Sequence, residues 1–157
     1  MPFVESPSIK HLDLKIGVGF VTGDSKMLLS ECSSLHILHI DAHKDLQTYI
    51  PIQVDMFPCN LVKLGFWYCI FEEDPMPVLE KLPKLTWLEL HICYQGSEIN
   101  CSANAFPELT YIALDGLFSL KYWHVARGGF PKLSDIEIYN VPLVKIPNAL
   151  PPNVAFK

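Results

Sequence analysis

A pattern of the form L-x-x-L-x-L recurs along this chain at an almost constant step. It starts at Ile9, Leu35, Leu61, Leu85, Leu109 and Leu133. Consecutive starts are 26, 26, 24, 24 and 24 residues apart. The fourth and sixth positions of each unit are aliphatic or aromatic, and this alternation is typical of a β-strand with one buried face. Stacking the units would pair these strands in parallel.

A fixed period of roughly 20–29 residues with this motif is the signature of a leucine-rich repeat. One repeat cannot bury its own apolar face, so neighbouring repeats must stack into a continuous core. The sequence therefore predicts an α/β solenoid of about six repeats, with a parallel concave β-sheet and a mostly irregular convex side. We expect a single domain over residues 1–157, in which residues 142–157 form a C-terminal cap.

The segments between the predicted strands carry most of the prolines. Phe106 and Phe130 each precede a proline, which favours an extended conformation at the residue before it. Asp74 and Pro75 are predicted to begin a short convex-side helix that continues to Leu82, with Asp74 as its N-cap.

The ninth position of each repeat turns the chain back into the core. Cys69 and Cys93 occupy it in adjacent repeats and are predicted to be buried thiols. The chain has five cysteines, an odd number, and no apolar segment near its start that is typical of a signal peptide. These features favour reduced thiols and a cytoplasmic location.

Composition narrows the class of partner. The net charge is −5 and the lysines and arginines are scattered, which argues against nucleic acid as a partner. The apolar runs are too short to span a membrane, so we expect no membrane insertion. The positive mean hydropathy of +0.22 indicates apolar surface that a partner would cover.

The sequence contains no convincing motif for nucleotide binding, metal binding or catalysis. The glycine-rich stretch Gly17–Gly23 has the spacing G-x-G-x-x-x-G rather than that of a dinucleotide-binding loop, so we predict a return loop and no cofactor. His39 should face solvent and His43 the turn, which does not bring them to one metal ion. We also expect His39 to lie beside Asp13 of the preceding repeat and Gly65 of the next. No catalytic residues are predicted, and the chain is not expected to be an enzyme.

The concave face carries the candidate binding residues, at positions three, five and seven of the later repeats. They are Trp67, Trp87, Glu89, His91, Tyr111, Asp115, Asp135, Glu137 and Tyr139. Exposed tryptophan and tyrosine are enriched at protein-binding hot spots, and the carboxylates would favour a partner with a basic patch. Alternatively, the aromatic side chains stabilise the sheet through cross-strand pairs.

The part from about Phe71 to Pro147 resembles a known family. The stretch Glu73–Leu85 is similar to an acidic-D-P-M-P-x-L-E-K-L-x-x-L segment, and F-P-x-L recurs before Leu109 and Leu133. Leu117–Trp123 and Leu143–Pro147 are similar to its L-x-x-L-x-x-W and L-x-x-[IL]-P motifs. This family is the leucine-rich-repeat domain of plant nucleotide-binding leucine-rich-repeat immune receptors of the coiled-coil class.

The resemblance implies a protein-recognition domain that senses a pathogen effector and holds the receptor in its off state. The implied partner is the effector or the receptor's own nucleotide-binding domain. The alternative function is a stand-alone leucine-rich-repeat adaptor or scaffold that recruits a protein partner.

Overall fold

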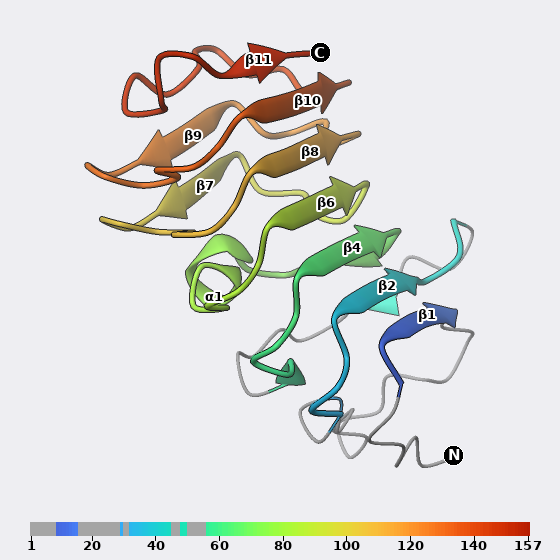
Figure 1. Ribbon diagram of the computed structural model, residues 1–157. Helices are drawn as coiled ribbons and strands as arrows, with labels where there is room; N and C mark the ends of the chain where they lie inside the picture. The colour runs from blue at the N-terminus through green and yellow to red at the C-terminus, as the bar shows by residue number, and fades with distance from the viewer. Residues whose placement is uncertain (1–8, 16–28, 30–31, 45–47, 50–55) are drawn as a thin grey trace.

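The computed structural model describes residues 9–15, 29, 32–44, 48–49 and 56–157, and these form a solenoid built on one parallel sheet. Its strands lie in the order β1 (His11–Lys15), β2 (Ile37–Asp41), β4 (Lys63–Trp67), β6 (Trp87–His91), β8 (Tyr111–Asp115), β10 (Asp135–Tyr139) and β11 (Ala155–Phe156). The strands rise one above another (Figure 1). The predicted leucine-rich-repeat fold is therefore confirmed.

The register of the sheet follows the sequence repeat. Each of the first six strands begins two residues after a predicted repeat start. Residues at equal repeat positions are cross-strand partners, so that Asp13 pairs with His39, His39 with Gly65 and Gly65 with Glu89. This register places all side chains of one repeat position in a row across the sheet.

The convex side is mostly irregular, as predicted. In the described part of the chain it contains two short parallel pairs and one helical turn. The pairs are β3 (Thr48–Tyr49) with β5 (Cys69–Ile70), and β7 (Glu98–Cys101) with β9 (Tyr122–Val125). The helical turn is α1 (Met76–Leu79).

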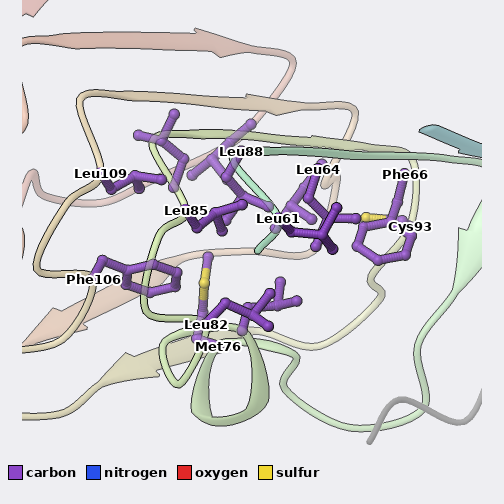
Figure 2. Close-up of a cluster of buried hydrophobic side chains, with 14 of the residues drawn as sticks. Leu61, Leu64, Phe66, Met76, Leu82, Leu85, Leu88, Cys93, Phe106 and Leu109 are labelled. Carbon is purple, nitrogen blue, oxygen red and sulfur yellow. The ribbon is translucent and has the colours of Figure 1, made fainter. Parts of the chain in front are cut away.

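The repeat leucines form the core between the sheet and the convex side. Leu61, Leu85 and Leu109, at the first position of successive repeats, are at most 1% exposed. Figure 2 shows them in one cluster with side chains from the convex side, including Met76 and Phe106. Burying each such side chain contributes on the order of 2 kcal/mol, so the stacked leucines account for much of the stability.

Phe106 and Phe130 correct one expectation. Their φ angles are +52° and +54°, so these residues before proline are not extended. Both rings are almost fully buried and stack with centroids 4.8 Å apart, and the Trp123 ring meets Phe130 edge-on. Packing of this aromatic column outweighs the local preference that the prolines impose.

The helix is shorter than predicted and begins later. It spans Met76–Leu79, with Pro75 rather than Asp74 at the N-cap position. Asp74 nevertheless accepts a hydrogen bond from the Met76 N–H at 2.9 Å. It also accepts hydrogen bonds from the backbone N–H and the side-chain amide of Asn100, at 2.7 and 3.3 Å. Asp74 therefore ties α1 to β7 of the next repeat.

Replacing Asp74 with alanine should lower the free energy of unfolding by about 1–3 kcal/mol, because backbone N–H groups would lose their acceptor. Urea denaturation of the purified chain would measure the loss. Glu73→Ala is the control, since Glu73 is exposed and should change stability by at most about 0.5 kcal/mol. Equal stability of the two variants would contradict this role for Asp74.

The turns that follow four successive strands share one backbone geometry. Tyr68, Ile92, Gly116 and Asn140, at the eighth position of four successive repeats, all have φ between +47° and +64°. The N–H groups of the first three donate to the strand-end carbonyl of the next repeat, at 2.8–3.0 Å. This left-handed residue continues the backbone ladder while turning the chain into the core.

The buried cysteines behave as predicted. Cys69 and Cys93 are fully buried, and the Cys69 thiol contacts the carbonyl oxygens of Ile40 and Trp67. Burial raises the pKa of Cys69 to about 12 and that of Cys93 well above its usual range. Both therefore stay protonated at neutral pH and pack as small apolar groups.

The end of the chain covers the last repeat. β11 pairs in parallel with β10, with Ala155 beside Asp135 and Phe156 beside Ile136. Val154 packs against the core, whereas the Phe156 side chain remains 53% exposed. The predicted glycine-rich return loop at Gly17–Gly23 lies outside the described residues.

Candidate protein-binding face

The concave face carries the predicted binding residues on four neighbouring strands, β4, β6, β8 and β10. Most of them are partly exposed: Trp67, Trp87, Glu89, His91, Asp115, Asp135 and Glu137. Tyr139 is half exposed. Tyr111 was expected to be exposed, and this is wrong, because only 8% of its surface is accessible.

Tyr111 is buried by its neighbour in the adjacent strand. Its ring stacks on Trp87 with centroids 3.6 Å apart and an interplanar angle of 17°. The Lys63 ammonium lies 5.0 Å from the Trp87 ring centroid, within reach of a cation–π contact. The three side chains form a row at the third repeat position, so this pair serves the sheet as cross-strand packing.

A second row of rings runs across the strands nearer the N-terminus. His39 meets the edge of Trp67 at 5.3 Å, and Trp67 stacks on His91 at 4.8 Å and 9°. A Cβ atom at Gly65 would lie 2.4 Å from the far end of the Trp67 ring. A side chain at this position would displace the indole, which lies back over its own strand. The space at Gly65 is therefore filled by Trp67.

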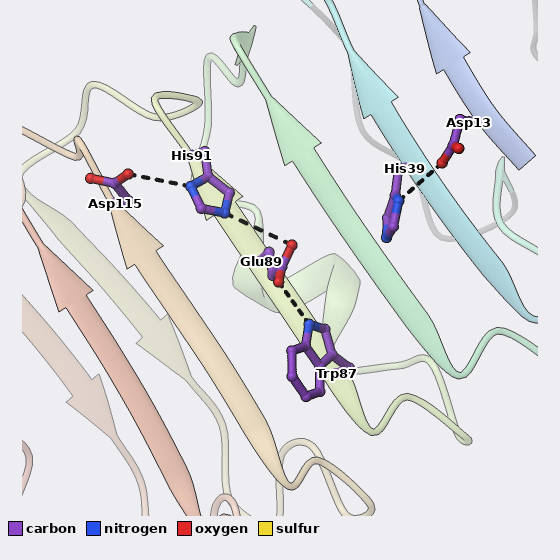
Figure 3. Close-up of polar contacts among 6 residues, drawn as sticks. All are labelled: Asp13, His39, Trp87, Glu89, His91 and Asp115. Atoms are coloured by element: carbon purple, nitrogen blue, oxygen red, sulfur yellow. Dashed lines mark hydrogen bonds and ion pairs between the residues drawn. The ribbon is translucent and has the colours of Figure 1, made fainter. Parts of the chain in front are cut away.

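Polar contacts join the two rows (Figure 3). The Trp87 indole N–H donates to Glu89 at 2.9 Å. His91 lies between Glu89, at 3.9 Å, and Asp115, at 3.4 Å. Asn140 donates to the other oxygen of Asp115 at 3.2 Å. This network fixes the rotamers of the aromatic side chains, which lowers the entropy that a partner's binding would cost.

Charge within the network sets the protonation of its members. Burial alone would lower the pKa of His91, but the neighbouring carboxylates of Glu89 and Asp115 raise that pKa above the usual value. The contact with His91 is also the largest cause of the lowered pKa of Glu89. The two carboxylates therefore extend the ion-paired state of His91 to higher pH.

His91 should stabilise the chain more at low pH than at high pH. A histidine with a raised pKa contributes fully below its unfolded value of about 6.5, and this contribution is lost as pH rises through the folded pKa. The stability difference between the natural chain and His91→Gln should shrink by up to about 1 kcal/mol from pH 5.5 to 8.5.

Urea denaturation at several pH values checks this, with His124→Gln as the control for an exposed histidine on β9. If the His91→Gln difference stayed constant across this range, the ion pairs of His91 would contribute nothing to folding.

The carboxylates predicted to attract a basic partner are largely paired within the sheet. Asp135 accepts from Ser134 at 2.7 Å and lies 3.1 Å from the Lys157 ammonium. Glu89 and Asp115 hold His91, as described above. A partner would therefore meet the negative charge of Glu137 and of the lone pairs on Asp115 and Asp135 that these contacts do not use.

Two side chains that contact this face, Asn140 and Lys63, were not among the predicted binding residues. Asn140 sits in a turn, outside the third, fifth and seventh positions, yet it contacts Asp115. Lys63 does occupy the third position, but its cation–π contact could be recognised only once the position of the Trp87 ring was known. The predicted neighbours Asp13 and His39 do contact each other, at 3.0 Å.

Comparison with known proteins places the chain among plant proteins. No family model matches it. It is 36% identical over 99 residues to the probable disease resistance protein RXW24L of Arabidopsis thaliana, and 34% identical over 120 residues to the probable disease resistance protein RF9. The disease resistance protein RPP8 is 41% identical over 83 residues.

These alignments cover 62%, 75% and 52% of this chain, respectively. They cover only 11%, 11% and 9% of the relatives, so the chain corresponds to about a tenth of their length. In the described residues no helix is long and apolar enough to cross a membrane. The repeat architecture and these similarities lead to one conclusion: the chain is a leucine-rich-repeat segment homologous to plant disease resistance proteins.

Proposed function

We propose that this chain is a protein-recognition part of a cytoplasmic plant immune receptor, where it senses a pathogen effector and helps to hold the receptor inactive. The observation that carries the proposal is the homology to disease resistance proteins over most of the chain. The concave face supports it, because it presents aromatic rings in fixed positions beside carboxylates. No catalytic step is part of the proposal.

Two side chains are best placed to meet a partner. Tyr139 is half exposed at the end of β10, and Trp67 is partly exposed in the row of rings near the centre of the face. Tyr111 and Trp87, by contrast, cover each other. A partner with aliphatic or basic side chains would fit this surface, since arginine stacks on aromatic rings and pairs with carboxylates.

The test is a binding titration of the full chain with the nucleotide-binding domain of a coiled-coil-class receptor and, separately, with candidate effectors. Trp67→Ala and Tyr139→Ala should each weaken binding about tenfold or more. Tyr139→Ala should change the melting temperature little, whereas Trp67→Ala also removes the ring that stacks on His91 and should lower it. Tyr122→Ala is the matched control, because Tyr122 is 44% exposed but lies on the convex-side strand β9.

Equal affinity of all three variants would place the interface elsewhere on the molecule. Binding to neither class of protein would refute the proposed receptor function and favour the adaptor alternative.

A further inference from the structure

A cluster of potential metal ligands lies at the N-terminal end of the concave face, next to the proposed protein-binding residue Trp67. It consists of His11 and Asp13 on β1 and His39 on β2, and their ligand atoms lie within 4.8 Å of one another. Asp13 Oδ1 is 3.1 Å from His11 Nε2 and 3.0 Å from His39 Nδ1. From this geometry we infer that the three side chains bind a divalent transition-metal ion such as Zn²⁺.

The sheet brings the three side chains to one side. His11 and Asp13 are two residues apart on β1, so their side chains share a face. Asp13 and His39 are cross-strand partners in the parallel register. The cluster therefore depends on the pairing of two strands rather than on a loop, which gives the ligands a firm backbone support.

The distances and the atom types suit the ion. Zinc–ligand bonds of 2.0–2.1 Å at tetrahedral angles place neighbouring ligand atoms about 3.3 Å apart, close to the two observed separations. Two imidazole nitrogens and one carboxylate oxygen suit Zn²⁺, Co²⁺ or Ni²⁺ better than Ca²⁺ or Mg²⁺, which prefer oxygen ligands. The two imidazole nitrogens are at most 4.8 Å apart, so the His11 ring must turn toward His39 for both to reach one ion.

Neighbouring rings orient the ligands before an ion arrives. The Trp67 ring holds His39 edge-on at 5.3 Å, and His11 meets His39 at 5.6 Å and 84°. A Cβ at Gly65 would approach the His39 ring to 3.3 Å, so glycine leaves the imidazole its space. His11, Asp13 and His39 are 52%, 63% and 35% exposed, so an ion can reach them from solvent.

Three protein ligands leave at least one coordination position open. On this exposed face, that position is available to water or to a donor side chain of a bound protein. The sequence pattern drew attention to His39 and His43 instead. The pairing of His39 with Asp13 was expected, but the position of His11 beside them needed the side-chain geometry.

The test uses the full chain without a polyhistidine tag, carrying Cys59→Ser because Cys59 is an exposed thiol that would compete for metal. Calorimetric titration with ZnCl₂ should show one ion per chain. Binding should weaken at least about tenfold in His11→Ala, Asp13→Asn and His39→Ala. His124→Ala is the control, and it should bind zinc unchanged, because His124 lies on β9.

A second measurement guards against misfolded variants. Titration with CoCl₂ should give visible absorption bands of a nitrogen- and oxygen-ligated ion without the near-ultraviolet band of a cobalt–thiolate bond. Circular dichroism of each variant verifies its fold. Absence of zinc binding, equal affinity in all folded variants, or a thiolate band would each overturn the assignment.

Discussion

Phe130→Ala should lower the free energy of unfolding by about 3–5 kcal/mol, the range for removing a buried aromatic ring. The Phe130 side chain is completely buried between Phe106, stacked at 4.8 Å, and Trp123, edge-on at 5.6 Å. Removing the ring leaves a cavity and breaks the aromatic column that joins two repeats on the convex side. The loss should appear as a lower urea midpoint with little change in the slope of the transition.

Phe118→Ala is the matched control for this experiment. The Phe118 side chain is 66% exposed, so the same chemical change there should cost at most about 0.5 kcal/mol. A Phe130→Ala chain as stable as the Phe118→Ala chain would mean that the column contributes no packing energy.

Gly116→Ala should destabilise the chain by about 1–3 kcal/mol. Gly116 has a φ of +64°, and a residue with a Cβ pays about 1–2 kcal/mol for the left-handed conformation. The added Cβ would also lie 2.5 Å from Ile92 Cγ1, so the side chain of the preceding repeat must move. Thermal and urea denaturation should both report the loss.

The double variant Gly116→Ala/Ile92→Ala separates the two causes. Removing most of the Ile92 side chain relieves the close contact but leaves the backbone cost in place. The double-mutant cycle should therefore show a favourable coupling of about 0.5–1.5 kcal/mol between the two substitutions. A coupling of zero, with the full loss retained, would assign the whole effect to the backbone conformation.

The period of the leucines was enough to predict six strands of the concave sheet, their parallel order and their register, but not the short strands of the convex side or β11. This succeeds because burial of one face fixes which residues point inward, and a slip of one residue would expose them all. The first position of each repeat, such as Leu61 or Leu85, follows directly from the pattern. Buried Cys69 and Cys93 follow from their place in the turn.

The predictions that proved wrong all concern residues that contact a neighbouring repeat. Phe106 and Phe130 defy the preference of residues before proline because each ring packs on its counterpart 24 residues away. Tyr111 is on the expected face, but Trp87 covers it. The start of α1 is also displaced, and Asp74 there bonds to Asn100 in the next repeat as well as to Met76. Local patterns show which way a side chain points, whereas its exposure depends on the neighbouring repeat.

The constant spacing of the later repeats has a consequence for how such a chain can change length. Trp87, Tyr111 and Asp135 occupy the same position on three adjacent strands, each 24 residues from the next. If residues 109–132 were lost, Leu133 would take the place of Leu109 as the first residue of the repeat that follows Leu85. Every remaining strand would stay in register. Gain or loss of whole repeats can lengthen or shorten the concave face, while the backbone ladder beneath it stays the same.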